Sequence, residues 1–336
     1  MFLTTIIRRA LLPVFLFSQF FLLAQTSSTA LKQIAQEAFD SVPSLGSVLV
    51  WQNDRIVCQQ YFNGANEETG FNVKSITKSV VSALAGIAYD RQLLPDLNTP
   101  ILNVLPEYAD TNSVKKELSL KDVLTMQVGI LWNDNDPTFK WKSLDGIKDY
   151  LELPFSEKPG TKFRYSTPAS HLFGVALARC VKTDLLTFGD STLFKPLGIP
   201  VLDWPNDKIG RRNGGSELKM RSTDMMKFGL LYLHNGRADG KQIISEEWVK
   251  QSTAEHATLN NWDVLPNANG YGYYWWRRKV EGYQAFIATG YGGQLICVIP
   301  DKQIVVVTTC FLNDENRGRP EIKRLHAVID KIVKTL

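Results

Sequence analysis

Ser75 and Lys78 have the residue types and the three-residue spacing of a nucleophile and its base. On a helix, residues three apart share one face with Cβ atoms about 5–6 Å apart, so the two side chains can meet. A serine hydroxyl becomes a strong nucleophile when a neighbour takes its proton, and a lysine can do so when burial lowers its pKa. The first turn of a helix also leaves backbone N–H groups available for an oxyanion. The pair therefore predicts nucleophilic acyl transfer.

The same Ser-x-x-Lys spacing begins at Ser113, in a polar connector, and at Ser216, in a glycine-rich loop. Only Ser75 opens an apolar helix after a pair of strands, where a buried lysine without a role would be costly. The alternative interpretation is that Ser75 is an ordinary helix N-cap and that Lys78 extends to water.

Two further segments could complete such a site. Tyr165 follows a turn at 159–160, and its phenol could exchange protons with Lys78, whose charge would lower the phenol's pKa. A packed aromatic ring is the alternative. The segment 288–294 has three glycines within four positions inside strand-like sequence. Such a pattern indicates close approach of backbone or ligand, or a bulge.

The elements that would position these segments are strands near both ends of the chain and helices between them. Turn signals and β-branched residues predict strands over 46–51, 55–61, 271–280, 283–289, 293–299 and 303–310. Apolar periodicity predicts helices over 75–89, 120–126, 170–181, 223–233 and 320–336.

Consecutive hairpin strands make the sheet antiparallel. We expect an α/β (α+β) fold, in which an antiparallel sheet flanked by helices is built from both termini, over about 30–91 and 265–336. A largely helical insertion over about 92–264 would lie between these parts.

The composition is that of a globular chain: 336 residues, 44% hydrophobic and 21% charged, with enough apolar material for a sizeable core. The net charge of +4 comes from scattered residues of both signs, with no basic block that would indicate a nucleic-acid partner. His and Cys residues lack metal-ligand spacing, so we expect no metal or other cofactor.

The four cysteines are far apart in sequence. In an exported protein a pair could be oxidised, but isolated cysteines in strand-like sequence are more often small buried hydrophobic residues. We favour the second interpretation for Cys58, Cys180, Cys297 and Cys310.

The N-terminus has the pattern of a secretory signal peptide over residues 1–24. Arg8 and Arg9 precede an apolar run over 10–24, and a polar stretch follows Ala24. The run is shorter than the roughly 20 residues that span a bilayer, although an uncleaved anchor is the alternative. We therefore expect an exported protein, periplasmic or secreted, with no stable membrane span after cleavage.

The order of the three segments resembles the serine β-lactamase and penicillin-binding-protein superfamily, which uses a Ser-x-x-Lys motif, a second polar motif and a Lys-Thr-Gly motif. The likeness is closest to class C β-lactamase-like hydrolases, whose second motif begins with tyrosine. It covers nearly all of residues 25–336 and includes the stretches 118–129 and 214–249.

The resemblance implies a role for each matching position. Ser75 matches the nucleophile that forms an acyl-enzyme, Lys78 matches its proton-transfer partner, and Tyr165 matches the general base or relay. The backbone N–H groups of Ser75 and Tyr291 would form the oxyanion hole, where each donor is worth about 3–4 kcal/mol in the transition state. The positions expected to bind substrate are Trp132, Thr167, Thr289 and Gly290.

Two positions depart from the family pattern. Thr167 stands where asparagine is common, and a hydroxyl lacks the extra donor of an amide. Ala288 stands where lysine or histidine is common, which removes a charge-assisted contact to a substrate carboxylate. Four basic residues could replace that charge: Lys162, Arg164, Arg277 and Arg278.

Aromatic and acidic residues near these segments have plainer interpretations. We interpret Trp132 as pocket-lining and the aromatic run over 273–276 as mainly packing. Asp134 and Asp136 could be a catalytic carboxylate pair, but their Asn- and Pro-rich surroundings favour solvated turn chemistry.

Together these features predict a serine hydrolase, an esterase or amidase, that cleaves a small ester, amide or peptide-like substrate through a Ser75 acyl-enzyme. The alternatives are a true β-lactamase or D-stereospecific peptidase, and a non-catalytic envelope protein that retains the fold. Protein partners leave no recognisable pattern in the sequence.

Overall fold

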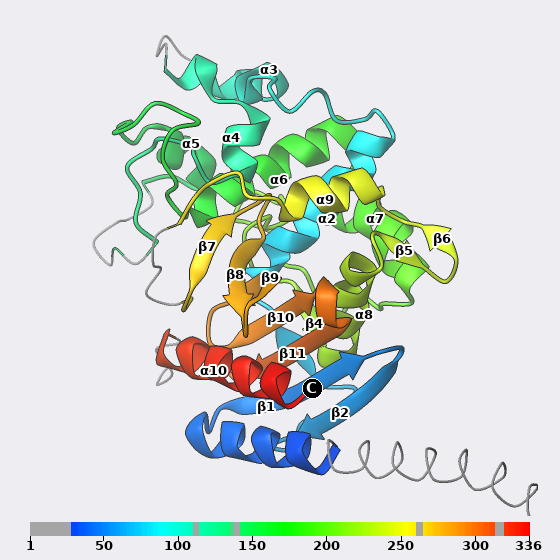
Figure 1. The fold of residues 1–336 in the computed structure, drawn as a ribbon. Coiled ribbons are helices and arrows are strands. Elements are labelled where there is room, and N and C mark those ends of the chain that lie inside the picture. Colours follow the sequence, from blue (N-terminus) through cyan, green and yellow to red (C-terminus); the bar gives the residue numbers. More distant parts are fainter. Residues whose placement is uncertain (1–27, 110–113, 135, 137–141, 260–264, 313–318) are drawn as a thin grey trace, which may run out of the picture.

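A seven-stranded antiparallel sheet forms the base of the molecule (Figure 1). The computed structural model describes residues 28–336 except 110–113, 135, 137–141, 260–264 and 313–318. The strand order is β2-β1-β11-β10-β9-β8-β7. The strands of this sheet are β1 (Leu45–Gln52), β2 (Arg55–Tyr61), β7 (Ala268–Tyr271), β8 (Trp276–Val280), β9 (Tyr283–Gly290), β10 (Gln294–Ile299) and β11 (Ile304–Cys310). N-terminal and C-terminal strands thus share one sheet, which confirms the expected fold class.

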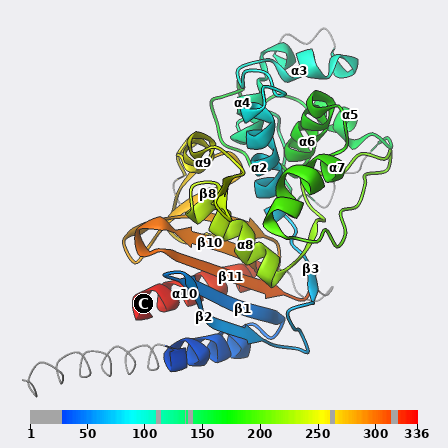
Figure 2. The same cartoon turned by 90° about the vertical axis from the view of Figure 1, so that its right-hand side faces the viewer.

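The central strands are covered on both faces. Every residue of β10 and β11 is buried, which explains their continuous apolar sequences. Helix α8 (Ser222–Leu233) packs against β10 and β11 on one face. The helix over 28–41 and α10 (Arg319–Thr335) lie on the opposite face (Figure 2).

The remaining helices form a second layer above the sheet (Figures 1 and 2). Helix α2 lies at its centre, and its residues 76–88 are all buried. Gly86 allows α9 (Glu246–Thr253) to approach closely, because a Cβ there would lie 2.4 Å from the Trp248 ring. The helices of this layer are α2 (Ile76–Asp90), α3 (Ile101–Val104), α4 (Leu120–Leu124), α5 (Gly146–Leu151), α6 (Thr167–Val181), α7 (Leu185–Gly189) and α9 (Glu246–Thr253).

Two short two-stranded ribbons come mainly from the part of the chain that we expected to be an insertion. One joins β5 (Arg237–Ala238) to β6 (Lys241–Gln242). The other joins β3 (Gly70–Asn72) to β4 (Lys219–Arg221) and so brings the start of α2 next to the loop over 213–218. Helix α8 begins after Arg221, slightly earlier than the N-cap expected at 223–224.

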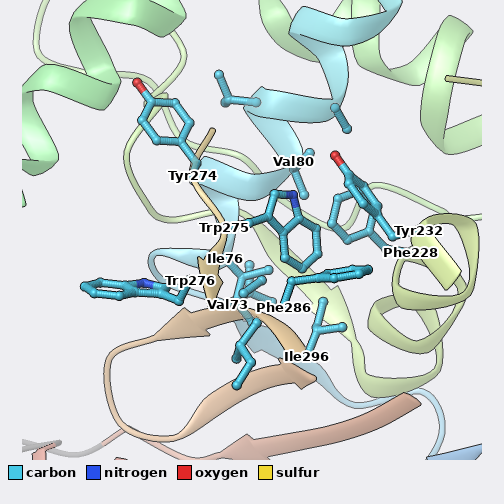
Figure 3. Packing of buried hydrophobic residues seen from close by; sticks show 14 of the residues in the cluster. Val73, Ile76, Val80, Phe228, Tyr232, Tyr274, Trp275, Trp276, Phe286 and Ile296 are labelled. Atoms are coloured by element: carbon cyan, nitrogen blue, oxygen red, sulfur yellow. The ribbon is translucent and has the colours of Figure 1, made fainter. Parts of the chain in front are cut away.

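The single strand expected over 271–280 is wrong. The chain forms β7 and β8 with a turn between them, in which Gly272 N–H donates to the Trp275 carbonyl at 2.8 Å. The turn directs large rings towards two helices. The centroid of the Trp275 ring lies 4.4 Å from that of Tyr232 in α8, and the centroid of the Tyr273 ring lies 5.6 Å from that of Trp248 in α9. Figure 3 shows Trp275 among Phe228, Tyr232 and Phe286, with Trp276 pointing to the other side.

Some expectations concern the ends of the chain and the thiols. The expected signal peptide, residues 1–24, lies outside the described residues. Among the described residues, no helix combines the length and the apolar character needed to cross a bilayer. All four cysteines are free thiols, and Cys58, Cys297 and Cys310 are buried, as the hydrophobic interpretation predicted.

Candidate active site

The turn between β3 and α2 places Ser75 at the start of a buried helix. Val73 N–H donates to the Leu218 carbonyl at 2.9 Å, which anchors the turn to the opposite loop. Lys74 has a left-handed backbone (φ 50°), and the Asn72 side chain accepts from its N–H at 3.0 Å. Ser75 is the N-cap of α2, yet its hydroxyl makes no capping hydrogen bond. That hydroxyl is therefore available for chemistry.

Lys78 lies one helical turn beyond Ser75 and is only 1% exposed. Its Nζ is 2.9 Å from Ser75 Oγ and 2.7 Å from the Gly215 carbonyl oxygen. Burial lowers the pKa of Lys78 from 10.5 to about 8, and the Asp134 charge partly opposes this shift. The alternative, in which Lys78 extends to water, is wrong because the fold encloses the amine next to the serine.

Tyr165 covers the same amine. Lys78 Nζ is 5.0 Å from the centroid of the Tyr165 ring, which stacks on Trp276 at 5.4 Å. Burial, with the Asp134 charge adding to it, raises the pKa of Tyr165 well above 10. The expected lowering of this pKa by Lys78 is therefore wrong, because desolvation dominates. At neutral pH the phenol keeps its proton, which suits a proton relay better than a phenolate base.

The start of α6 sets the place of the second motif. Ser166 is the N-cap: its hydroxyl accepts from Ala169 N–H at 3.2 Å and donates to the Tyr150 hydroxyl at 3.0 Å. This cap places Tyr165 just before the helix and Thr167 at its first position. Thr167 Oγ1 lies 3.2 Å from Lys78 Nζ, so the second motif meets the first.

Asp134 lies in an exposed turn, as the solvated-turn interpretation predicted, but it also lines this cavity. Its carboxylate accepts from the Thr167 hydroxyl at 2.7 Å and from Thr167 N–H at 3.0 Å, and the Trp132 indole N–H also donates to it. Asp136 is exposed and does not line the cavity. The contact that recruits Asp134 joins residues 33 apart in sequence, and only its closeness to Trp132 could have signalled the role.

The end of β9 closes the other side. A Cβ on Gly290 would lie 2.2 Å from the Val73 carbonyl oxygen, so only glycine lets this strand reach the turn before Ser75. Thr289 Oγ1 is buried and has no hydrogen-bond partner among the described residues. Gly293 bends the chain back with φ 98°. Tyr291 follows the motif and lines the same cavity as Ser75. The oxyanion role expected of their two N–H groups stays a prediction.

These elements enclose a cavity of about 740 Å³. Its wall includes every expected site residue except Lys78, which lies just behind it. Apolar side chains supply much of the lining: Trp132, Leu144, Ile147, Trp276 and Ile322. Such a wall is typical of a small-molecule site.

The residues proposed to replace the missing charge at position 288 do not line the cavity. Lys162 pairs with Glu157 at 2.9 Å, and Arg278 is fully buried against Asp330. The cations that do line the cavity are Lys74, which pairs with Glu217 at 3.0 Å, and Lys208.

A histidine that sequence reasoning passed over supports the loop behind Lys78. Gly214 N–H donates to His171 Nδ1 at 3.2 Å, so the ring proton is on Nε2, which donates to Asp207 at 2.9 Å. Arg211 Nε also donates to Asp207, at 2.7 Å. Burial, the largest influence, lowers the pKa of His171, which keeps the ring neutral. The network holds the Gly215 carbonyl against Lys78.

Comparison with known families agrees with this geometry. A family model described as beta-lactamase matches residues 33–331. The chain belongs to the beta-lactamase family. Members of this fold family are serine hydrolases, so the hydrolase class follows, whereas the bond cleaved does not. None of the curated proteins matches the chain.

Of the three Ser-x-x-Lys positions, Ser113 lies outside the described residues and Ser216 lies in a loop.

Solved structures share the fold over most of the chain. A structure described as a putative beta-lactamase from Bacteroides dorei is 19% identical with a TM-score of 0.72, covering 90% of this chain and 98% of that one. A beta-lactamase/D-alanine carboxypeptidase from Yersinia pestis is 18% identical with a TM-score of 0.72, covering 92% and 98%. EstCE1, a hydrolase with promiscuous acyltransferase activity, is 14% identical with a TM-score of 0.73, covering 91% and 99%. At these identities the likeness shows the fold alone.

Proposed function

We infer that this protein is an exported serine hydrolase that cleaves an ester or amide bond through an acyl-enzyme on Ser75. The observation that carries the proposal is the buried Lys78 amine, 2.9 Å from Ser75 Oγ, with its pKa lowered to about 8. A lysine in this state is a general base at neutral pH.

The reaction starts with attack of Ser75 Oγ on the substrate carbonyl carbon while its proton moves to Lys78 Nζ. The N–H groups of Ser75 and Tyr291 stabilise the oxyanion. The bond to the leaving group then breaks, and the leaving group takes a proton that Lys78 returns through the Tyr165 hydroxyl. Water then adds to the acyl carbon and gives a proton to Lys78. The bond between that carbon and Ser75 Oγ breaks, the proton returns from Lys78 to Oγ, and the carboxylic acid leaves.

The cavity wall supports an apolar or neutral acyl group. The apolar side chains named above dominate it, and position 288 supplies no cation, because it is a buried alanine. A substrate carboxylate would therefore lack a charge-assisted contact from that strand. This favours esters and amides over β-lactams and peptidoglycan stem peptides, which carry such a carboxylate.

Similar structures support the class of reaction. One is EstCE1, a hydrolase with promiscuous acyltransferase activity, and another is a beta-lactamase/D-alanine carboxypeptidase. All of these reactions transfer an acyl group. Export is proposed from residues 1–24 alone, and the N-terminal sequence of the protein recovered outside the cytoplasm tests it.

The deciding experiment measures hydrolysis of p-nitrophenyl butyrate by the wild-type protein and by Ser75→Ala, with a chromogenic cephalosporin assayed in parallel. We expect ester turnover that Ser75→Ala abolishes, and little cephalosporin turnover. Faster cephalosporin turnover would favour the β-lactamase alternative. Equal inertness of both proteins towards both substrates would favour the non-catalytic alternative.

A further inference from the structure

Whether Lys78 can act as a base depends on the direction of its hydrogen bond with Ser75. Its three acceptors are Ser75 Oγ at 2.9 Å, Thr167 Oγ1 at 3.2 Å and the Gly215 carbonyl oxygen at 2.7 Å. An ammonium group satisfies all three with its three N–H bonds. A neutral amine has two N–H bonds and one lone pair. Only if that lone pair faces Ser75 can Lys78 remove the serine proton.

The Gly215 carbonyl can only accept, so it holds one N–H bond. A Cβ at Gly215 would lie 2.8 Å from Thr167 Cγ2, so only glycine lets this peptide come so close. The other two neighbours are hydroxyls, which can donate or accept. A free Thr167 hydroxyl could donate to the lone pair of Lys78 and so compete with Ser75.

Asp134 removes this competition. The Thr167 hydroxyl donates to Asp134 Oδ2 at 2.7 Å, and Thr167 N–H donates to Oδ1 at 3.0 Å. An ionised carboxylate can only accept, and a hydroxyl has a single proton. The Thr167 proton is therefore committed to Asp134. Thr167 must accept the second N–H of Lys78, and the lone pair is left for Ser75.

We propose that Asp134 is a positioning residue for the base: it orients the Thr167 hydroxyl so that Thr167 accepts from Lys78 and the amine faces Ser75. The proposal rests on the serine-hydrolase function above. A second consequence follows for substrates. Because the single proton of its hydroxyl is donated to Asp134, Thr167 cannot donate a hydrogen bond to the acyl group of the substrate. An amide carbonyl on the acyl side therefore gains no hydrogen bond at this corner of the cavity.

The charges around Lys78 give the proposal a pH signature. Several charged and titratable groups share its cavity: Asp134, Tyr165, Tyr291, His171, Asp207, Lys208 and the Lys74–Glu217 ion pair. Of these, Asp134 acts on Lys78 by holding its pKa up against the effect of burial. Loss of the carboxylate should therefore shift the acidic limb of kcat/KM to lower pH while it lowers the plateau. A purely structural loss would lower the plateau without shifting the limb.

The test compares four variants of the full chain: Asp134→Ala, Thr167→Asn, the double variant, and Asp136→Ala as a matched control. Asp136 is an exposed carboxylate two residues away that does not line the cavity. An amide oxygen accepts without help from a carboxylate, so Thr167→Asn should make Asp134 dispensable. The assays are p-nitrophenyl butyrate hydrolysis against pH and the rate at which a fluorophosphonate modifies Ser75, followed by mass spectrometry.

We expect Asp134→Ala to lower kcat and the modification rate on the order of 10-fold to 100-fold. This is less than the roughly 10²–10⁴-fold that a general base contributes as a whole, because Asp134 acts on the base only through Thr167. Formate should restore part of the rate, because Asp134 is exposed. Adding Asp134→Ala to Thr167→Asn should cost little, and Asp136→Ala should match the wild type. Equal losses from Asp134→Ala in both backgrounds, or an unmoved acidic limb, would overturn the proposal. Absence of Ser75 modification in the wild type would instead overturn the proposed function.

Discussion

The most informative prediction concerns the pH at which Lys78 becomes a base. Burial lowers its pKa from 10.5 to about 8. This shift is worth about 3.4 kcal/mol in favour of the neutral amine. At pH 7 about one buried amine in ten is then neutral, against about one in 3,000 for an exposed lysine. The site thus gains roughly 300-fold in the fraction of active base.

The assay is kcat/KM for p-nitrophenyl butyrate across neutral and alkaline pH, read at the isosbestic wavelength of nitrophenol. We expect kcat/KM to rise with a slope of one and to level off near pH 8. Neighbouring groups do not explain such a limb, because the pKa of His171 is lowered from 6.5 and that of Tyr165 is raised above 10. A limb near 10, or activity retained in Lys78→Met, would refute the reasoning.

The same shift has a consequence for stability. The unfolded chain holds the Lys78 proton up to a higher pH than the native protein does, so the unfolding free energy should rise with pH between about 8 and 10.5. Urea titrations should show this rise in the wild type and a flatter profile in Lys78→Met. An identical profile in both proteins would mean that the amine is not desolvated.

Three further predictions concern groups in and away from the cavity. Burial lowers the pKa of His326 to about 3. The unfolding free energy should therefore fall as the pH drops below 6.5, with a limiting slope of about 1.4 kcal/mol per pH unit. A plot of the urea midpoint against pH should show this fall in the wild type and be flatter in His326→Phe. Gly290→Ala would place a Cβ 2.2 Å from the Val73 carbonyl oxygen. The esterase kcat should fall on the order of 100-fold, as it does when an oxyanion donor is lost. A variant with the same kcat as the wild type would refute the close approach. Tyr165→Phe should keep its ring packing and thermal midpoint but lower kcat about 100-fold, and an unchanged kcat would exclude the relay.

Local sequence patterns accounted for the elements that carry the motifs. Helix α2 and strands β1, β2, β9, β10 and β11 lie within one or two residues of their expected ranges. Burial periodicity and turn chemistry are local, so they can be recognised without the rest of the chain. The exception is the run over 271–280, where the turn depends on where its aromatic rings pack.

The candidate site likewise has a part that local sequence predicts and a part that depends on contacts between distant segments. Ser75 and Lys78 lie within one helical turn, so their pairing could be predicted from spacing alone. The roles of Asp134 and His171 could not, because each depends on contacts with residues more than 30 positions away. The direction of the pKa shift of Tyr165 could not be predicted from the sequence either, because it depends on how deeply the ring is buried.

By itself the sequence determined which candidate functional groups the protein has: a nucleophile and an amine on one face of a buried helix, a tyrosine motif, and a glycine-rich strand end. The tertiary structure decided which groups are charged and which way their protons point. Hydrogen-bond direction and desolvation depend on every atom around a group, and in this protein those atoms come from distant segments: Asp134 beside Thr167, and the Gly215 carbonyl beside Lys78. Only in that enclosure does the Lys78 amine acquire the lowered pKa that its proposed role as a base requires.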